Sequence, residues 1–251
     1  MASTASGWPA DTDRIILEEV DSTSAEAARR APGAPVWILA LRQTGGHGRR
    51  GRPWATAPGN FAASLAWRPA GAPVEHALRS YVAALALHDA LDAMGVAGLS
   101  LKWPNDVLLD GGKLAGILLE SPGDGLLILG IGINLIAAPD AASVEQGATP
   151  PVSLLSASGL RVGPEAMLDA LAPAFAAREA QMATQGFAPI RAAWLDRAAR
   201  LGEAVTARMP AETVTGTFRD LDEEGRMVLG TQAGERRITA AEIFFGAVPC
   251  S

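Results

Sequence analysis

A mostly apolar segment, Leu126–Leu135 (LLILGIGINL), sets the strongest constraint on the fold. A strand without an alternating polar face is typical of a central position in a sheet that is covered on both sides. Before it along the chain, Asp110-Gly111-Gly112 is a strong signal for a tight hairpin turn between strands at Asp106–Leu109 and Leu114–Glu120. The sequence therefore predicts a sheet around Leu126–Leu135, with a hairpin preceding that strand.

Two different patterns follow one another along the chain and predict an α+β fold in two parts. Residues 1–201 mix predicted strands and helices, whereas residues 202–251 contain only short predicted strands separated by turns. We expect a mixed, mainly antiparallel sheet with packed helices first, and then a separate small β-barrel of about 50 residues. The other predicted strands are Arg14–Glu19, Val36–Leu41, Asn60–Trp67, Leu99–Trp103, Ala204–Met209, Thr213–Asp220, Arg226–Gly230 and Glu235–Ile238, and the predicted helices begin near Ala25 or span His76–Met94, Pro164–Gln185 and Pro189–Arg200.

Composition and charge argue against several classes of protein. With 49% hydrophobic and 19% charged residues, the 251-residue chain is typical of a soluble globular protein, and its net charge of −6 argues against a globally basic nucleic-acid binder. Its single cysteine, Cys250, allows no internal disulfide or cysteine-based zinc site, which favours a cytoplasmic setting. Residues 1–13 lack a signal-peptide pattern and are too few for a helix-turn-helix domain, and no stretch reaches the roughly 18 apolar residues of a membrane helix.

The segment Gln43–Trp54 (QTGGHGRRGRPW) has a composition that no buried strand tolerates, with four glycines and three arginines. Glycines let a backbone approach a ligand and present N–H groups to an anion, and the fork-shaped guanidinium groups of Arg49, Arg50 and Arg52 suit phosphate. The alternative is a mobile surface loop whose arginines are solvated. The segment lacks the GxxxxGK[ST] pattern, so it is not a Walker A loop.

Three further segments carry residues of a kind found in ligand sites. The hairpin would bring Asp106 close to Lys113, where the lysine can neutralise a carboxylate that meets a phosphate and the aspartate can orient it or hold Mg²⁺; the alternative is a structural ion pair. The glycines of Gly130-Ile-Gly-Ile-Asn134 indicate close approach by a ligand or another backbone. The hydroxyls of Ser22-Thr23-Ser24 suit a ureido or amide ligand, unless they only cap a helix. No serine–histidine–aspartate pattern and no suitably placed cysteine indicates a hydrolase.

Taken in this order, the segments resemble the catalytic domain of biotin–protein ligases, a family whose fold is similar to that of class II aminoacyl-tRNA synthetases. The resemblance extends over residues 14–246. One such motif is weak evidence, whereas five in the family's order are specific. Glu242-Ile243-Phe244 also resembles the last strand of the family's SH3-like C-terminal domain. The matching segments are Asp21–Thr23, Gly46–Trp54, Lys102–Asp106 (KWPND), Lys113–Leu118 (KLAGIL) and Gly130–Asn134.

The resemblance implies an ATP-dependent enzyme that converts biotin to biotinyl-5'-adenylate and transfers biotin to a lysine of a carboxylase's biotin-carrier domain, with Mg²⁺ as cofactor. It implies catalytic roles for Arg49, Asp106 and Lys113, with Asp106 as a Mg²⁺ ligand. We expect the glycine- and arginine-rich loop to close over the adenylate and exclude water. The implied biotin-binding residues are Ser22, Thr23, Ser24, Gln43, His47, Gly48, Arg49, Lys113 and Gly116. The implied nucleotide-binding residues are Arg49, Arg52, Trp54, Lys113, Gly130, Gly132 and Asn134.

Two positions depart from the family pattern. His47 stands where the family usually has the first arginine of GRGRRGR, and Ser24 stands where an asparagine usually follows Ser-Thr. These changes leave two alternatives open: a lipoate– or octanoate–protein ligase of the same fold, and a non-catalytic sensor that binds biotin or its adenylate. The sequence leaves the oligomeric state open between a monomer and a homodimer, and it indicates neither a nucleic-acid nor a membrane partner.

Overall fold

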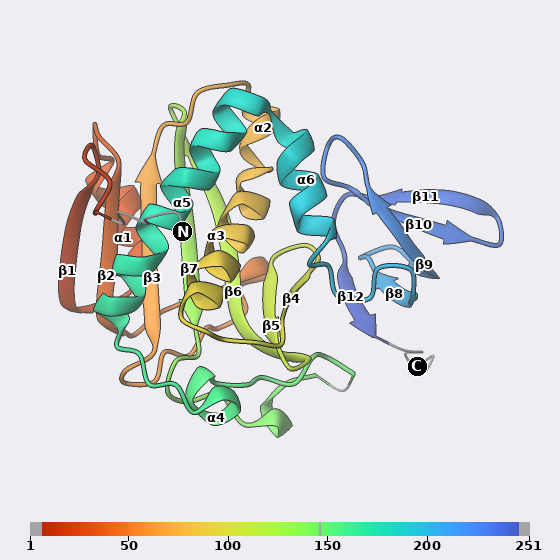
Figure 1. Ribbon diagram of the computed structural model, residues 1–251, viewed down its shortest axis with the longest axis horizontal. Helices are drawn as coiled ribbons and strands as arrows, with labels where there is room; N and C mark the ends of the chain where they lie inside the picture. The colour runs from red at the N-terminus through yellow and green to blue at the C-terminus, as the bar shows by residue number, and fades with distance from the viewer. Residues whose placement is uncertain (1–6, 146, 246–251) are drawn as a thin grey trace.

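Two sheets contain every strand of the described residues, 7–145 and 147–245, in the computed structural model (Figure 1). The strands of the first sheet are β1 (Asp13–Val20), β2 (Val36–Gln43), β3 (Phe61–Trp67), β4 (Leu99–Lys102), β5 (Asp106–Leu109), β6 (Gly112–Gly123) and β7 (Leu126–Ile133). Their order across the sheet is β1-β2-β3-β7-β6-β5-β4, and only β1 and β2 run parallel. The predicted mixed, mainly antiparallel sheet is therefore confirmed. Cys250 and residues 1–6 lie outside the described residues.

Strand β7 lies in the middle of this sheet, as its apolar sequence predicts. It pairs antiparallel with β3 on one side and with β6 on the other. The predicted hairpin joins β5 to β6 and turns at Asp110 and Gly111, whose φ angles of 48° and 78° are those of a tight two-residue turn. In this register Asp106, the first residue of β5, lies opposite Gly116 of β6. The polar start of the hairpin therefore borders the glycine-containing part of the sheet.

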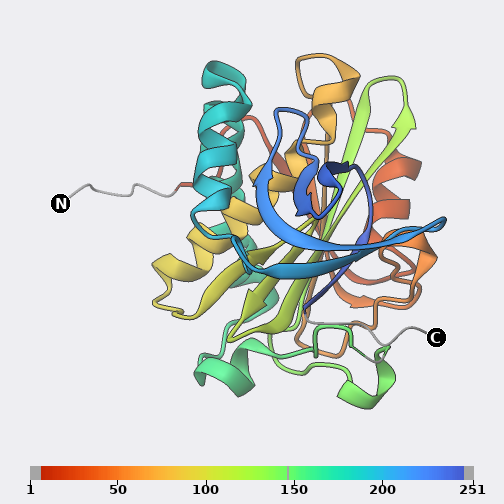
Figure 2. The same ribbon diagram turned by 90° about the vertical axis from the view of Figure 1, so that its right-hand side faces the viewer.

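The two faces of the seven-stranded sheet are covered differently (Figures 1 and 2). Helices α3 (Arg79–Ala93) and α5 (Pro164–Gln185) pack against one face, and α1 (Thr23–Arg30) packs against the other. Alternate residues of β7, including Leu129 and Ile131, belong to the core under α3 and α5, whereas Gly130 and Gly132 face the side of α1. Because α1 has only 8 residues and glycine has no side chain, this second face stays open beyond α1.

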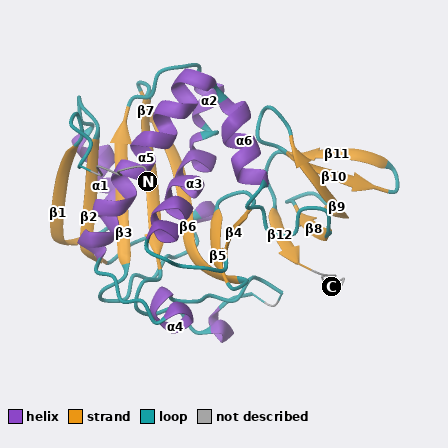
Figure 3. Cartoon of the chain, in the orientation of Figure 1, coloured by secondary structure: helices purple, strands orange, loops and turns teal. Residues whose placement is uncertain are grey.

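The predicted helix His76–Met94 is divided in the structure. A short α2 (Pro73–His76) precedes α3, which begins at Arg79 (Figure 3). Arg79 is buried, and its guanidinium donates hydrogen bonds to the Glu75 carbonyl at 3.0 Å and to the Glu179 carboxylate of α5 at 3.1 Å. The break between α2 and α3 is thus held by hydrogen bonds from the Arg79 side chain. The helical spacing of apolar residues does not reveal this break.

The last predicted helix, Pro189–Arg200, also has different bounds, since α6 spans Phe187–Leu195. Proline is tolerated in the first turn of a helix, where its missing N–H has no intrahelical partner, so α6 starts before it. After α6 the backbone pairs with β4 instead of continuing the helix, because Leu101 donates to the Arg197 carbonyl and accepts from the Ala199 N–H. A further short helix, α4 (Leu154–Ser158), was not predicted. None of the helices in the described part of the chain is long and apolar enough to span a membrane.

The second sheet is fully antiparallel. Its strands are β8 (Ala204–Arg208), β9 (Thr213–Leu221), β10 (Met227–Thr231), β11 (Gly234–Ile238) and β12 (Glu242–Phe245). The order is β11-β10-β9-β8-β12, so β11 and β12 are its edge strands. The four strands predicted from the sequence pattern are confirmed, and β12 is the segment assigned by resemblance. The SH3-like topology and the boundary between residues 201 and 202 stay predictions.

The two sheets share one hydrophobic core. Trp194 of α6 lies between Tyr81 of α3 and Phe218 of β9, with edge-to-face ring contacts at centroid distances of 5.5 and 6.5 Å. Trp103, just after β4, donates from Nε1 to the Gly225 carbonyl at 3.1 Å, in the turn between β9 and β10. The second sheet is therefore packed beside the β4 edge of the first sheet rather than joined to it by a linker alone (Figure 1).

Candidate active site

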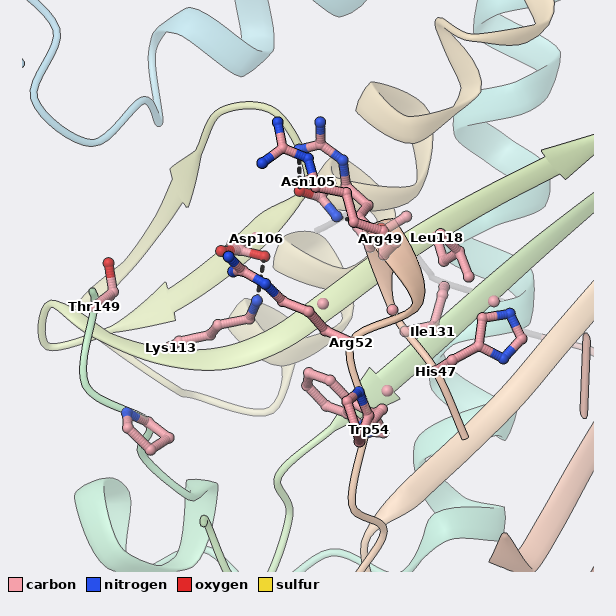
Figure 4. A pocket seen from close by; sticks show the side chains of 18 of the residues that line it. His47, Arg49, Arg52, Trp54, Asn105, Asp106, Lys113, Leu118, Ile131 and Thr149 are labelled. Carbon is pink, nitrogen blue, oxygen red and sulfur yellow. Dashed lines mark hydrogen bonds and ion pairs between the residues drawn. The ribbon is translucent and has the colours of Figure 1, made fainter. Parts of the chain in front are cut away.

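A pocket of about 520 Å³ lies on the α1 side of the seven-stranded sheet (Figure 4). Its walls come from the start of α1, the loop at residues 43–54, the β4–β5 turn, strands β6 and β7, residues 139, 144, 145, 148, 149 and 151, and the start of β12. All the residues that the resemblance assigns to the site line it: Ser22, Thr23, Ser24, Gln43, His47, Gly48, Arg49, Arg52, Trp54, Asp106, Lys113, Gly116, Gly130, Gly132 and Asn134. The structure thus brings the predicted residues together, and their individual roles stay predictions.

One end of the pocket is a network of hydroxyl groups at the N-terminus of α1. Ser22 caps the helix by accepting a backbone N–H. Thr23 donates from its backbone N–H and its hydroxyl to Gln43 Oε1, at 2.9 and 3.2 Å. Ser64 of β3 donates to the Thr23 hydroxyl at 2.8 Å and lies 3.1 Å from the Ser24 hydroxyl. The helix-cap alternative for this segment is therefore right for Ser22, while Thr23 and Ser24 present a fixed polar surface to the pocket.

The floor of the pocket is flat because glycines face it from two adjacent strands. Gly116 of β6 and Gly132 of β7 are paired across the ladder. The indole of Trp54 lies on them, so that a Cβ at Gly132 would be 2.3 Å from the ring and a Cβ at Gly116 would be 3.1 Å from it. A Cβ at Gly130 would lie 2.8 Å from Ser24 Oγ. A side chain at Gly130 or Gly132 would therefore displace a neighbouring residue of the pocket.

The glycine- and arginine-rich loop is a short hairpin in which the Gly48 N–H donates to the Arg52 carbonyl at 2.8 Å. Arg49 and Arg52 reach different partners, and Figure 4 shows Arg49 beside Asn105. Arg49 extends to the β4–β5 turn, where Nη1 lies 3.4 Å from Asn105 Oδ1, and Arg52 extends to β12. Burial lowers the pKa of Arg49, which forms no ion pair with any carboxylate of residues 7–145 and 147–245. The alternative of a loop with solvated arginines is therefore wrong for Arg49.

Lys113 and Asp106 form the charged centre of the pocket. Lys113 Nζ lies 2.7 Å from Asp106 Oδ1, so the proximity predicted from the hairpin is confirmed. The Lys113 ammonium also lies 5.8 Å from the centroid of the Trp54 ring. Lys113 therefore stands between the glycine floor and the β5 carboxylate, where two anionic groups of a ligand would meet.

A chain of ion pairs joins the loop to the second sheet. Glu242 of β12 accepts from Arg52 at 2.5 Å and from Arg208 of β8 at 2.9 Å. Arg208 also pairs with Glu145 at 2.5 Å. Burial alone would raise the pKa of Glu242, but the hydrogen bonds from the two arginines outweigh it and lower the pKa to about 2. The second sheet thus completes the wall of the pocket instead of standing apart from it.

This attachment gives a pH-dependent stability that Glu242→Gln should remove. A carboxyl group whose folded-state pKa is lowered stabilises the fold above its ordinary pKa, here 4.5, and this stability is lost as the pH falls towards 2. Allowing for the exposure of Arg52, we expect Glu242→Gln to lose about 1–2 kcal/mol of unfolding free energy relative to wild type above pH 5, and this difference to shrink at pH 3. Urea unfolding of wild type and Glu242→Gln, followed by tryptophan fluorescence at pH 5 and at pH 3, measures this difference in unfolding free energy.

Glu212→Gln is the matched control, because Glu212 is exposed and pairs only with exposed Arg236 among the described residues. It should stay within about 0.5 kcal/mol of wild type at both pH values. A stability difference between wild type and Glu242→Gln that is the same at pH 5 and pH 3 would contradict the account.

The pocket offers a single suitable carboxylate to a metal ion. Within the described part of the chain there is no group of three or more histidine, cysteine, aspartate or glutamate side chains that could hold one. Asp106 Oδ1 faces the Lys113 ammonium at 2.7 Å, and the other carboxylates that line the pocket, Glu145 and Glu242, are held by arginines. Mg²⁺ at nucleotide sites is usually held by one or two carboxylates together with substrate phosphates. The donor set therefore fits a Mg²⁺ ion that is held mainly by a nucleotide.

Several residues of the pocket were missed in the sequence. Ser64 does not line the pocket but hydrogen-bonds to Thr23, and its only signal is a hydroxyl in an otherwise apolar strand. Lys102 belongs to the KWPND segment, but its spacing gives no role. Thr149, Glu145 and Glu242 reach the pocket only through the tertiary fold, from segments whose patterns indicate coil or a separate unit.

Comparisons with known proteins agree with this geometry. Residues 19–134 match the sequence profile of the biotin/lipoate A/B protein ligase family, and residues 201–246 match that of the biotin protein ligase C-terminal domain. The biotin–[acetyl-CoA-carboxylase] ligase of Paracoccus denitrificans is 54% identical to this chain over 239 residues, which cover 92% of this chain and 100% of that protein. The chain belongs to the biotin protein ligase family.

This chain is also similar to other biotin protein ligases. The biotin–[acetyl-CoA-carboxylase] ligase of Mycobacterium tuberculosis is 34% identical over 95% of this chain and 90% of that protein. A solved structure of the biotin protein ligase from Aquifex aeolicus, in complex with biotin and ATP, has a TM-score of 0.80 and 26% identity over 92% of this chain and 97% of that chain. The resemblance and the α+β fold class predicted from the sequence are therefore confirmed.

The two departures from the biotin protein ligase pattern lie in different parts of the pocket. His47 turns to β6, where Nε2 lies 3.4 Å from Glu120 Oε1, and both side chains are partly exposed. It does not contact the ion pair of Lys113 and Asp106 (Figure 4). Ser24 keeps a hydroxyl in the polar network and packs against Gly130. Neither change removes a charge from the centre of the pocket.

Proposed function

We propose that this member of the biotin protein ligase family joins biotin to AMP with ATP and then transfers the biotinyl group to a lysine of a biotin carboxyl-carrier domain. The observation that carries the proposal is the order of three features along one pocket: the hydroxyl network, the glycine floor and the charged centre at Lys113 and Asp106. Biotin has a polar ureido ring at one end, an aliphatic chain and a carboxylate at the other end. The ureido ring matches the hydroxyl network, the aliphatic chain matches the glycine floor, and the carboxylate matches the charged centre.

The polar end suits the ureido ring. Its carbonyl is an acceptor and its two N–H groups are donors, and the hydroxyls of Ser22, Thr23 and Ser24 provide both kinds of partner. Gln43 accepts from Thr23 through its oxygen, which fixes the orientation of its amide group. In this orientation the aliphatic chain runs along the floor at Gly130, beside the Trp54 ring that covers Gly116 and Gly132, and the carboxylate reaches Arg49 and Lys113.

The charged centre suits the first chemical step. A carboxylate oxygen of biotin forms a bond to the α-phosphorus of ATP, the bond from that phosphorus to the β-phosphate oxygen breaks, and pyrophosphate leaves. Lys113 and Arg49 would offset the repulsion between the two anions, which is strongest in the transition state. A Mg²⁺ ion held by the phosphates and Asp106 would add charge neutralisation there.

The second step needs a neutral amine from the acceptor. The lysine nitrogen attacks the acyl carbon of the adenylate and loses a proton as the amide forms. The bond from the acyl carbon to the phosphate oxygen breaks, and AMP leaves with the bonding electrons. Gly48 and Trp54 belong to the hairpin that borders the acyl end of the pocket, so they would shield the mixed anhydride from water. We propose that this loop moves when the substrates enter.

The same fold also serves lipoate ligases, and the hydroxyl network favours biotin over lipoate. Thr23 and Gln43 already bond to each other, so lipoate would leave neither of them unpaired. A dithiolane ring has no carbonyl and no N–H group, however, and would form none of the hydrogen bonds that the hydroxyls offer to a ureido ring. A site that hydrogen-bonds its substrate rejects an analogue that lacks the groups by large factors. The match of residues 201–246 to the biotin protein ligase C-terminal domain supports the same choice.

Incubation with an acceptor tests the proposal. The protein is mixed with ATP, Mg²⁺ and a biotin carboxyl-carrier domain, with biotin, lipoate or octanoate in parallel, and the intact mass of the acceptor is measured. We expect a mass increase with biotin alone, which disappears when the acceptor lysine is replaced by arginine. Modification by lipoate instead would support the lipoate ligase, and biotin binding without modification of the acceptor would support the sensor.

We propose a cytoplasmic setting, where the carboxylases and ATP are found, and no nucleic-acid partner. The edge strand β1 has no partner on its outer side among the described residues, so pairing of two copies there is the form that a homodimer would take, while a monomer is the alternative.

A further inference from the structure

Lys102, the last residue of β4, places a second buried ammonium group in the wall of the pocket. Its residue surface is 7% exposed, and its Nζ donates to Thr149 Oγ1 at 2.7 Å. The ammonium also lies 5.0 Å from the centroid of the Phe245 ring. Unlike Lys113, it forms no ion pair with a carboxylate of residues 7–145 and 147–245. Burial of a cation without a paired anion is costly, so an anionic group of a ligand would relieve this cost.

Lysine is rare in this chain, and Lys102 is one of two lysines. Of 21 lysine and arginine residues, only Lys102 and Lys113 are lysines, and the remaining 19 are arginines. Both lysines line the one pocket that contains the predicted site. Lysine differs from arginine in offering a compact point charge with freely rotating donors, which suits phosphate oxygens in a confined space. A chain that uses arginine everywhere else thus has a side-chain ammonium group only at these two positions.

The fold fixes Lys102 and Thr149 next to the charged centre. Lys102 lies opposite Asp106 in the β4–β5 pair, and Asp106 is the partner of Lys113. The segment that carries Thr149 is paired with β6, because the Lys113 N–H donates to the Pro150 carbonyl at 2.7 Å. The Thr149 hydroxyl accepts from Lys102 and keeps its own hydrogen to donate. Lys102, Thr149 and Lys113 therefore form a continuous set of donors on one side of the pocket.

We propose that Lys102, assisted by Thr149, binds the β- and γ-phosphates of ATP and the pyrophosphate that leaves. The inference rests on the proposed function and divides the work between the two lysines. When the bond between the α-phosphorus and the bridging oxygen breaks, the bonding pair stays on pyrophosphate, and Lys102 stabilises this added charge. Lys113 and Arg49 remain with the biotin carboxylate and the α-phosphate. The transfer of biotin from the adenylate to lysine involves no pyrophosphate and makes no use of Lys102.

Separate measurement of the two half-reactions tests this division. In Lys102→Met, which removes the charge and keeps the volume, we expect adenylate formation from ATP to fall by about 10²–10³-fold. Transfer from biotinyl-adenylate supplied ready-made should stay within about twofold of wild type. The control is Ser24→Ala, at the other end of the pocket, which should raise the KM for biotin and leave the KM for pyrophosphate unchanged. Unchanged adenylation in Lys102→Met, or an equal loss of transfer, would overturn the inference.

A binding measurement gives a readout that does not depend on turnover. Because the chain has two lysines, protein labelled with ¹⁵N at lysine Nζ gives at most two side-chain ammonium signals, which Lys102→Met assigns. We expect magnesium pyrophosphate to shift the Lys102 signal, and Lys102→Met to weaken pyrophosphate binding by about tenfold or more. A shift confined to Lys113 with unchanged affinity would contradict the inference. If the wild-type protein showed no biotin-dependent exchange of labelled pyrophosphate into ATP, the proposed function itself would be contradicted. A failure of the proposed function can therefore be distinguished from a failure of the role proposed for Lys102.

Discussion

Lys113→Ala is expected to reduce the rate of biotinyl-adenylate formation by about 10³-fold. Lys113 supplies the positive charge that lies 2.7 Å from Asp106 at the point where the carboxylate and the α-phosphate would meet. Without it, the two anions must approach each other with one positive charge fewer beside them, since Arg49 and Mg²⁺ alone remain. Quenched-flow measurement of the adenylate formed from biotin and labelled ATP gives the rate directly. A loss smaller than tenfold would contradict a central role for this lysine.

The substitution also leaves the partly buried Asp106 carboxylate without its partner, which can destabilise the fold. The double variant Asp106→Asn/Lys113→Ala separates the two effects, because it removes the unpaired charge. We expect it to recover most of the thermal stability and none of the adenylation rate. Arg42→Ala is the control for a lost cation, since Arg42 is exposed and pairs with exposed Glu19; it should leave the rate unchanged.

Gly132→Ala is expected to lower kcat/KM for biotin by about 10²-fold. The new Cβ would lie 2.3 Å from the Trp54 indole, so the ring must leave the glycine floor and the loop that carries it must shift. Steady-state kinetics and calorimetric titration with biotin measure the effect. Gly33→Ala is the matched control, because a Cβ at Gly33 meets no atom within 4 Å. Wild-type affinity in Gly132→Ala would show that the flat floor is not needed.

The parts of the fold that were predicted correctly depend on local sequence. The apolar run of β7 requires a covered central position, and Asp110-Gly111 adopts the positive φ angles of a tight turn wherever strands flank it. The break before α3 was missed because it depends on the buried side chain of Arg79, which bonds to Glu179 on another helix. Local periodicity carries no information about such a partner.

The same distinction applies to the pocket. Each of the five segments alone also allows a purely structural interpretation, and they were found because together they occur in the order of the biotin protein ligase family. The wall contributed by Glu242 was not assigned, because its partner Arg52 is 190 residues away in the sequence. Lys102 was present in a matched segment, yet its burial beside Thr149 and the absence of an ion pair within the described residues emerge only in three dimensions.

Biotin-dependent exchange of labelled pyrophosphate into ATP tests the central claim most directly, since it reports adenylate formation without any acceptor protein. We predict exchange that requires both biotin and Mg²⁺, that is absent when lipoate or octanoate replaces biotin, and that is lost in Lys113→Ala. Exchange with lipoate instead of biotin, or tight binding of biotin by wild type without any exchange, would contradict the account.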